Sequence, residues 1–423
     1  MNGNGSGYDV IVVGARVAGS STAMLLARQG LRVLAVDRAS FPSDTLSTHQ
    51  VQVPGVARLA RWGLLDRLVD AGTPAATRAR FDTEVCLLDG HFPAFEGANA
   101  VLSPRRTLLD ALLVGAAREA GADVRESFVV EEIVIEDGAV VGIRCREKGG
   151  EEVTERARLV IGADGKHSKV ADAVDASVYN EHEPVSMASY AYWEGVELDG
   201  GWLMGREGWA MGAWPTNDGL TMNVVSLPRS RFEAFRSDVE GTMLATLDGA
   251  GELGRRIRAG RRVERFRASP DLPNRFRVPY GPGWALAGDA GLVMDPISGQ
   301  GIGHAFRDAE LIADAAAAWM GGVETFDAAF GRYQKVRDEE TKPMFDFTLD
   351  IAEMAAPQPK FVLLLEAIRD RPEEIDRFLG LLTGTEPISR YLSPANMRKL
   401  IGVRGIAKVV LNKVRAGRQR AAA

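Results

Sequence analysis

The chain has 423 residues, of which 46% are hydrophobic and 26% are charged, and its net charge is -6. This composition is typical of a globular protein with room for two joined domains, and it gives no general attraction to nucleic acid. No apolar run approaches the ~20 residues that cross a bilayer, and no basic segment precedes the first apolar stretch. We therefore expect a cytoplasmic protein with neither an integral membrane segment nor a signal peptide.

The first elements along the chain predict a β-α-β unit. A β-branched run from Tyr8 to Val13 predicts a buried strand, residues 20–30 have helical spacing, and a second strand is expected at 32–37. A helix is predicted at 106–121. The unit is typical of a parallel sheet with helices packed on it.

The next segments predict a hairpin and a further buried strand. Residues 124–135 and 139–146 alternate in polarity on either side of Asp137-Gly138, which suits a tight hairpin turn. Residues 157–162 form another apolar run that stops at a turn. We expect this run to join the first sheet.

The middle of the chain has a different residue composition. Residues 180–269 are rich in Trp, Tyr and Met and contain Pro/Gly turns, which predicts an inserted sheet of strands. A short apolar strand at 284–289 and a helix at 301–320 then resume the first fold.

The C-terminal segment, residues 325–423, is helical in pattern. We expect helix breaks at Pro343, at 357–359 and at 383–384. The stretch 404–420 is locally basic, which fits either a solvated terminal helix or a contact with a membrane surface or a partner.

Three turns carry the chemical signal, and the first lies between the first strand and its helix. The run from Gly14 to Gly19 would aim free backbone N–H groups at a pyrophosphate, and Asp37 at the next strand end could accept hydrogen bonds from a ribose. Arg16 replaces the middle glycine of the usual G-x-G-x-x-G pattern, and its guanidinium is a candidate contact for phosphate. The alternative is a packing turn without a ligand.

The second turn is Gly162 to Ser168, and the third comprises Ala287 to Ala290 followed by residues 295–303. In the second turn Asp164 precedes Gly165, and Ser168 could cap the next helix, so a capped structural turn is an open alternative. In the third, a carboxylate at a strand end could bind hydroxyl groups, and a glycine-rich helix start presents partial positive charge to an anion. A helix start with flexible glycines remains the alternative there.

The order and spacing of these three turns resemble the p-hydroxybenzoate hydroxylase superfamily of FAD-dependent enzymes, over roughly residues 8–340. The resemblance implies an α/β fold: a Rossmann-like FAD-binding domain, an inserted antiparallel β-sheet substrate domain and a helical C-terminal region. We expect the FAD-binding domain at 1–75, 101–180 and 275–330, the substrate domain at 76–100 and 181–274, and the helical region at 331–423.

The same resemblance assigns expected cofactor contacts. Asp37 would bind the adenosine ribose, Arg106 would lie along the pyrophosphate and ribityl chain, Val130 would meet adenine by its backbone, and Asp289 would hold the ribityl chain. Asp164 and its turn would serve both FAD and a transient nicotinamide. The remaining expected FAD contacts are Gly14, Arg16, Val17, Ala18, Gly19, Arg38, His49, Pro296, Gly299, Gly301 and Ile302, the last three facing the isoalloxazine.

His49 is the candidate catalytic residue. It follows the ribose carboxylate in a loop and would fall near the flavin ring, where it could donate a hydrogen bond or shuttle a proton. A loop histidine satisfied by backbone is the alternative reading. The histidines have no metal-ligand spacing, and we assign no metal.

The inserted sheet supplies the expected substrate pocket. Its aromatic and Met side chains suit a flat, apolar substrate, although core packing is the alternative for each of them. The expected pocket residues are Tyr192, Trp202, Trp209, Met211 and Trp214. Phe345, Phe347 and Met354 are further candidates to close the pocket, with core packing the alternative. The run from Trp209 to Pro215 only faintly resembles the tryptophan signature of flavin halogenases, and no counterpart of their lysine is present, so we do not expect halogenation.

The family resemblance implies a monooxygenase that uses NADPH or NADH and O2 through a flavin C4a-hydroperoxide to hydroxylate or epoxidise a small molecule. We expect a bulky, apolar, aromatic or polyketide-like substrate. The alternatives are a reductase or dehydrogenase of the geranylgeranyl-reductase-like type and a non-catalytic flavin-binding protein. The expected partners are the substrate and O2, with no nucleic acid, and the sequence carries no signal for an oligomeric state.

Overall fold

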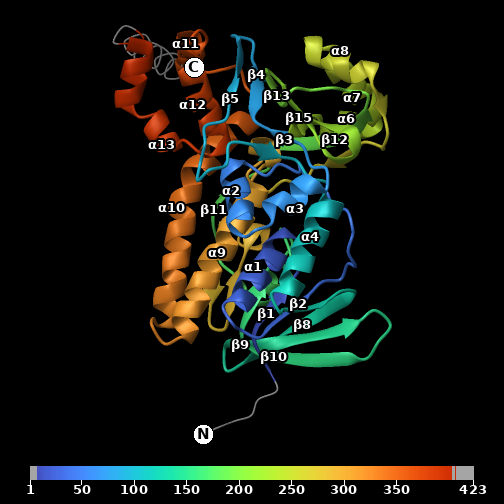
Figure 1. Ribbon diagram of the computed structural model, residues 1–423, viewed down its shortest axis with the longest axis vertical. Helices are drawn as coiled ribbons and strands as arrows, with labels where there is room; N and C mark the ends of the chain where they lie inside the picture. Colours follow the sequence, from blue (N-terminus) through green and yellow to red (C-terminus); the bar gives the residue numbers. More distant parts are fainter. Residues whose placement is uncertain (1–6, 403–404, 406–423) are drawn as a thin grey trace.

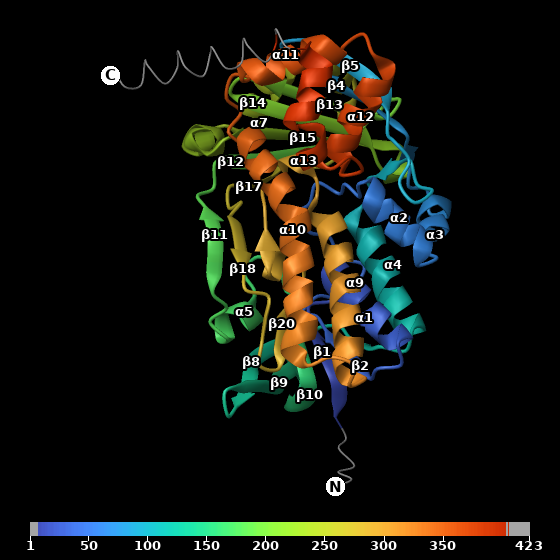
Figure 2. The same cartoon turned by 90° about the vertical axis from the view of Figure 1, so that its left-hand side faces the viewer.

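The computed structural model of the chain describes residues 7–402 and residue 405. Its α/β architecture agrees with the expected fold (Figure 1): a region built on a largely parallel sheet lies below a second, mainly antiparallel sheet, and helices connect the two. Long helix α10 (Phe326–Ala352) runs along the side of the molecule from the first region to the second (Figure 2).

The first sheet has the strand order β19-β20-β10-β1-β2-β7. Strands β20, β10, β1, β2 and β7 pair in parallel with one another, which buries both faces of this part of the sheet and explains the continuous apolar runs. The strands are β1 (Tyr8–Val13), β2 (Val33–Val36), β7 (Asp123–Arg125), β10 (Glu152–Gly162), β19 (Tyr280–Gly281) and β20 (Trp284–Leu286).

The predicted hairpin is confirmed and is attached to this sheet. Strands β8 (Phe128–Glu136) and β9 (Ala139–Glu147) pair antiparallel, and β9 continues onto the first half of β10. Asp137 and Gly138 have φ values of 48° and 79°, the left-handed conformation that a tight hairpin turn requires.

Helices α1 (Val17–Arg28), α4 (Arg106–Glu119) and α9 (Gly301–Met320) cover one face of the first sheet. The opposite face carries the hairpin and α5 (Lys169–Ala173). The first helix begins three residues before the predicted start at residue 20, because the chain enters it directly from the glycine turn.

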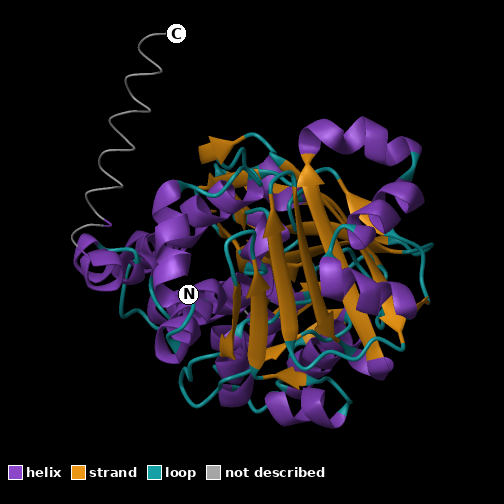
Figure 3. Ribbon diagram, turned by 90° about the horizontal axis from the view of Figure 1, so that it is seen from above, coloured by secondary structure: helices purple, strands orange, loops and turns teal. Residues whose placement is uncertain are grey.

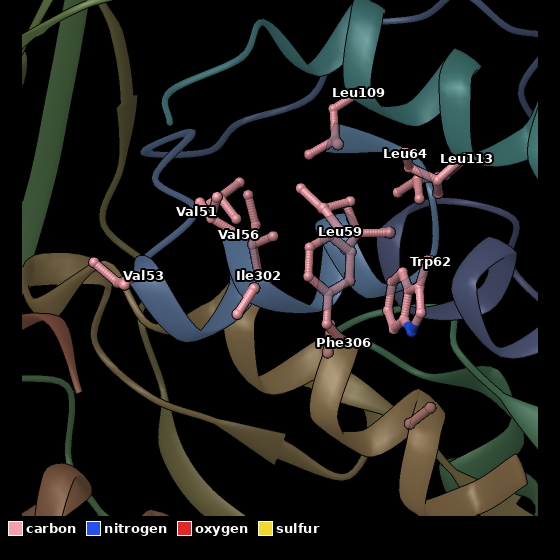
Figure 4. Close-up of a cluster of buried hydrophobic side chains, with 14 of the residues drawn as sticks. Val51, Val53, Val56, Leu59, Trp62, Leu64, Leu109, Leu113, Ile302 and Phe306 are labelled. Atoms are coloured by element: carbon pink, nitrogen blue, oxygen red, sulfur yellow. The ribbon is translucent and has the colours of Figure 1, made fainter. Parts of the chain in front are cut away.

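Helix α2 (Val53–Arg61) lies between α4 and α9, and α3 (Leu65–Asp70) follows it. Figure 4 shows Leu59 of α2 and Phe306 of α9 packed together, with Leu109 of α4 above them. The rings of Trp62 and Phe306 are 5.0 Å apart at their centroids. This buried cluster fixes the segment before α2 beside the first turn of α9.

The second sheet has the order β16-β12-β15-β14-β13-β4-β5, with β17 paired to β12. Its pairings are antiparallel except that of β13 with β4, which is parallel. The strands are β4 (Arg78–Asp82), β5 (Leu87–His91), β12 (Ser186–Glu194), β13 (Gly201–Arg206), β14 (Trp209–Pro215), β15 (Leu220–Pro228), β16 (Arg261–Arg262) and β17 (Arg267–Ser269).

Two small sheets join the regions. One pairs β3 (Ala75–Ala76) with β6 (Val101–Leu102). The other pairs β11 (Val178–His182), β18 (Asn274–Arg277) and β21 (Leu292–Val293).

The inserted segment also contains helices, which the sequence analysis missed. Helices α6 (Phe232–Ser237), α7 (Val239–Asp248) and α8 (Gly251–Ala259) cover one face of the second sheet (Figure 3). Asp238 caps α7 by accepting a hydrogen bond from Gly241 N, and Met243 and Leu247 are buried four residues apart. These local signals favour a helix, although the surrounding segment has the composition typical of strands.

The C-terminal region comprises α10, α11 (Pro359–Ile368), α12 (Pro372–Thr383) and α13 (Ile388–Tyr391). The break expected at Pro343 is wrong, because α10 continues through it with Thr341, Met344 and Phe345 all buried, and this packing holds both halves in line. The breaks at 357–359 and 383–384 are confirmed. Among the described residues, no helix combines the length and apolarity that crossing a membrane requires. The basic stretch 404–420 lies outside the described residues, apart from residue 405.

Candidate functional site

The three turns singled out in the sequence lie together at one edge of the first sheet. Val13 pairs with Gly162, and Gly162 pairs with Leu286, so β1, β10 and β20 end at the same level. Ala163 N donates to Val13 O, and Ala287 N donates to Gly162 O, each at 2.8 Å. The carboxyl ends of parallel strands are where α/β sheets bind ligands.

Close backbone packing explains two of the glycines. Gly14 has φ 96°, and a Cβ at that position would lie 2.5 Å from Ala163 O. A Cβ at Gly288 would lie 3.0 Å from the Cβ of Ala18, at the start of α1. The first turn therefore contacts both of the others, and at Gly14 only glycine fits without displacing backbone.

Two helices begin at this edge without a side-chain cap. Neither the side chain of Arg16, before α1, nor that of Gln300, before α9, accepts a hydrogen bond from the first turn of its helix. Both helices therefore present backbone N–H groups that an anion could satisfy. Gly301 is exposed, and a Cβ there would meet no atom within 4 Å, so the start of α9 faces open space.

The second turn is closed on itself. Asp164 accepts hydrogen bonds from the hydroxyl of Ser168 at 2.5 Å and from Lys169 N at 2.7 Å, and Ser168 caps α5. This is the capped turn that the sequence analysis kept as an alternative. A contact of Asp164 with a cofactor stays a prediction.

Asp37 ties the end of β2 to the first turn. Its carboxylate accepts from Ala15 N at 2.7 Å and from Ala39 N at 2.8 Å. Arg38 is exposed beside it, and the carbonyl of Val130 accepts from Lys169 Nζ at 2.6 Å. The expected adenosine contacts thus lie around the end of β2 and the start of β8.

A buried ion network lies below the first turn. Arg16 Nη1 is 2.7 Å from Asp110 Oδ2, Arg106 Nη2 is 2.9 Å from Asp110 Oδ1, and Arg16 Nη2 donates to the hydroxyl of Ser43 at 2.9 Å. Desolvation raises the pKa of the Asp110 carboxyl, and the two guanidinium groups oppose that rise. The guanidinium of Arg16 is therefore held by protein groups, and its contact with phosphate stays a prediction.

Asp289 is exposed at the same edge, yet enough protein surrounds it that desolvation raises the pKa of its carboxyl, with Arg106 and Lys166 opposing the rise. A carboxylate in this position suits hydroxyl groups of a bound molecule, which would replace its lost hydration. Together with the uncapped helices, it fits the phosphate and ribityl portions of FAD.

His49 is buried and adopts a left-handed backbone with φ 64°. Its Nε2 is hydrogen-bonded to the hydroxyl of Tyr192, and no described residue is bonded to its Nδ1. Desolvation, followed by the charges of Arg106 and Arg105, lowers the pKa of His49 to about 3. The imidazole is therefore neutral near pH 7.

A cavity of about 380 Å³ lies between the second sheet and the C-terminal helices. The sheet contributes mainly apolar side chains, including Ala79, Phe81, Leu203, Trp209, Trp214 and Val224. The helices close it with Met344, Phe347, Met354, Phe361, Leu364 and Leu379. The loop before α9 also contributes to the wall, with Pro296, Ser298 and Gly299.

The expected pocket residues separate into two groups. Trp209, Met211 and Trp214 line the cavity. Trp202 packs instead between the sheet and α8, with the guanidinium of Arg256 5.8 Å from its ring, and Tyr192 faces His49. Phe347 and Met354 also line the cavity, whereas Phe345 packs against Phe276.

Sequence reasoning missed Thr48, Gln50 and Gln52, which line the cavity. The signal that could have found them is the alternation of polar and apolar residues along this loop. Val51, between Gln50 and Gln52, is buried in the core and pairs with Leu102. Side chains alternate between two faces in a β-strand, and we did not expect that alternation in a segment predicted to be a loop.

Residues 7–226 match a family model described as an FAD binding domain. The chain belongs to this family, the p-hydroxybenzoate hydroxylase-like flavoproteins. It is accordingly an FAD-dependent oxidoreductase of the monooxygenase and halogenase-like group.

Two relatives and one solved structure illustrate the range of this group. The chain is 26% identical to digeranylgeranylglycerophospholipid reductase 1 of Methanopyrus kandleri over 370 residues, 82% of this chain and 90% of that protein. It is 25% identical to rifampicin monooxygenase of Streptomyces venezuelae over 401 residues, 91% of this chain and 77% of that protein. The flavin-dependent brominase Bmp2 shares the fold, with TM-score 0.78, 20% identity and coverage of 94% and 98% of the two chains.

Proposed function

We propose that this flavoprotein is a monooxygenase that uses NADPH or NADH and O2 to hydroxylate or epoxidise a bulky, apolar small molecule, aromatic or polyketide-like. The observation that supports this most is the cavity of about 380 Å³, because the loop before α9 lines it. In the proposed arrangement the flavin ring lies against Gly299, Gly301 and Ile302, so the substrate and the ring meet at that loop. Pockets of this size bury most of a drug-sized molecule.

The proposed cofactor contacts follow the sheet edge. The pyrophosphate would lie over the first turn of α1, the ribose at Asp37, and the ribityl hydroxyls at Asp289, with Arg106 as the neighbouring cation. FAD, when bound, would supply hydride acceptance and oxygen activation, which no side chain can provide. The protein's own contribution is to position both molecules and to exclude water from the space between them.

His49 would act as a neutral hydrogen-bonding group. Because its pKa is lowered to about 3, the imidazole carries no positive charge at pH 7. A neutral imidazole has one nitrogen that donates a hydrogen bond and one that accepts, so it can move a proton only by accepting at one nitrogen and donating at the other. Tyr192 occupies Nε2, which leaves Nδ1 for a further partner. We propose a positioning or proton-shuttling role for this pair.

The rival function is reduction of an isoprenoid or other unsaturated compound without oxygen insertion. The similarity to a digeranylgeranylglycerophospholipid reductase favours it, because an apolar cavity also suits a prenyl chain. A single experiment separates the two. The purified holoprotein is incubated with NADPH, candidate substrates and ¹⁸O2, and the products are analysed by mass spectrometry.

Incorporation of one ¹⁸O atom is the expected result. A product two mass units heavier than its substrate, formed equally well without oxygen, would replace the monooxygenase with the reductase. A flavin that NADPH cannot reduce, with or without substrates, would reject both enzymes in favour of a non-catalytic flavin-binding protein.

A further inference from the structure

Two glutamine side chains lie where the cavity meets the loop before α9. A Cβ placed on Gly299 would be 2.9 Å from Gln52 Nε2 and 3.0 Å from Gln50 Oε1, so both amides lie against the backbone of Gly299. Both residues line the cavity. They are therefore beside the position at which the proposed function puts the reacting end of the substrate.

The pair is held in place by protein hydrogen bonds. Gln52 Nε2 donates to Gln50 Oε1 at 3.0 Å and to Ser298 O at 3.3 Å. Gln52 is only 5% exposed. The segment that carries the pair is itself fixed, because Val51 exchanges backbone hydrogen bonds with Leu102 at 2.8 and 3.1 Å.

Each glutamine retains hydrogen-bonding capacity. No described residue accepts a hydrogen bond from Gln50 Nε2, and none donates one to Gln52 Oε1. The pair thus offers one free donor, on Gln50, and one free acceptor, on Gln52, which matches a hydroxyl group because a hydroxyl both accepts and donates. A polar group left without a partner in such a cavity would carry a desolvation cost.

The charged residues that line the cavity are exposed or paired, and none of them is among the atoms nearest Gly299. The charged residues that line the cavity are Glu84, Arg206, Asp350, Glu353 and Lys360. Glu84, Asp350, Glu353 and Lys360 are exposed, and Arg206 is paired with Asp82 at 2.7 Å. The side chains that lie against Gly299 are the neutral ones of Gln50 and Gln52. The part of the cavity at Gly299 therefore suits a neutral oxygen group rather than a carboxylate or an ammonium ion.

We propose that Gln50 and Gln52 recognise a hydroxyl group on an otherwise apolar substrate and so orient the adjacent carbon toward the loop at Gly299. The inference deepens the proposed function and rests on it for the reaction, but the recognition itself is a binding property. It predicts a substrate that carries a hydroxyl group on an apolar skeleton, and it disfavours pure hydrocarbons.

The test compares probes that differ by a single hydroxyl group. Binding of 2-naphthol and naphthalene, and of phenol and benzene, to the holoprotein is followed by tryptophan fluorescence, since Trp209 and Trp214 line the cavity. We expect the hydroxylated member to bind about tenfold more tightly in at least one pair, the ratio that one or two net hydrogen bonds give. In the double variant Q50M/Q52M this ratio should fall to about one, while the hydrocarbon still binds.

Retained hydrocarbon binding, FAD content and melting temperature establish that the double variant is folded. Q358M is the matched control, because Gln358 lines the cavity from the exposed start of α11, away from Gly299, and its ratio should equal that of the wild type. A wild-type ratio of one in every pair, or a ratio unchanged in Q50M/Q52M, overturns the inference. These outcomes are independent of ¹⁸O incorporation, so failure of the recognition and failure of the monooxygenase are distinguishable.

Discussion

The sheet edge that fits FAD and the cavity beside it are built in opposite ways. At the edge, backbone packs on backbone: a Cβ on Gly14 would lie 2.5 Å from Ala163 O. On the cavity wall, a Cβ on Gly205 would meet no atom within 4 Å. At Gly14 the edge has no room for a side chain, whereas at Gly205 the cavity wall has room for one.

This difference separates what the family shares from what the individual protein does. Relatives as different in name as a reductase, a monooxygenase and a brominase match this chain. We attribute the shared cofactor to the edge and the choice of substrate to the cavity wall, where residues from several distant segments meet.

Substitution of Gly14 tests the close backbone packing at the sheet edge and should have the largest effect. G14A adds a Cβ against the carbonyl of Ala163 in a left-handed backbone, and we expect a loss of about 3 kcal/mol or more in the free energy of unfolding, together with loss of FAD. Thermal unfolding and the flavin-to-protein absorbance ratio measure both.

G30A is the control, because Gly30 also has a left-handed backbone, with φ 86°, but lies in open space. It should cost only about 1 kcal/mol and retain FAD. Equal losses in the two variants would mean that backbone conformation, and not contact between the turns, sets the requirement at Gly14.

Acid titration of His49 tests whether this buried histidine lowers the stability of the folded protein at low pH. The pKa of His49 is lowered to about 3 in the folded protein, below its ordinary value, so the unfolded chain binds a proton that the folded one does not. This contribution to stability is fully present above about pH 6.5 and is lost as the pH falls toward 3, by up to about 1.4 kcal/mol per pH unit.

H49N should flatten this part of the stability profile, because asparagine does not titrate and accepts a left-handed backbone. Chemical denaturation of the two holoproteins between pH 7 and pH 4 gives the difference in slope. Parallel profiles would show that His49 is protonated as readily in the folded state as in the unfolded chain.

G205V tests whether the cavity wall accepts an added side chain. Gly205 lies on the cavity face of β13 together with Leu203, so the added side chain should enter the cavity and leave the fold and FAD content unchanged. We expect KM for a bulky substrate to rise about tenfold. G115V, on α4, also adds a side chain in open space and should leave KM unchanged; a similar rise there would point to a general effect on the fold.

R16G restores the usual fingerprint glycine and should have the smallest effect. Its guanidinium is partly exposed and bonded to Asp110 and Ser43, so we expect a loss of about 1 kcal/mol in stability and little change in FAD affinity. Fluorescence titration of the apoprotein with FAD measures the affinity. A tenfold weakening at unchanged melting temperature would instead indicate a direct contact with the pyrophosphate.

The sequence predicted the edge well because its requirements are local. A glycine between a strand and a helix, or an aspartate at a strand end, can be recognised within a few residues, and the positions of Gly14, Asp37 and Asp289 at one edge agree with that reasoning. The helices α6 to α8 and the continuity of α10 through Pro343 were missed. At Pro343 tertiary packing outweighs the local effect of the proline, whereas α7 has local helix signals, such as the Asp238 cap, that lie within a segment otherwise typical of strands.

The cavity could be predicted only in part. Trp209 and Trp214 were found because the strands of the inserted segment are rich in aromatic residues, but the same feature also selected Trp202, which packs against the helices on the other side. Gln50 and Gln52 belong to a loop whose direction is set by packing of Val51 and Val53 beneath it. No sequence period reveals that direction.

A crystal structure of the holoprotein with 2-naphthol tests the central claim most directly. We predict one FAD with its pyrophosphate over the first turn of α1, its ribityl chain at Asp289 and its ring at Gly299, and the naphthol hydroxyl between Gln50 and Gln52. A flavin ring bound away from the loop at Gly299, with the cavity opening elsewhere, would contradict it.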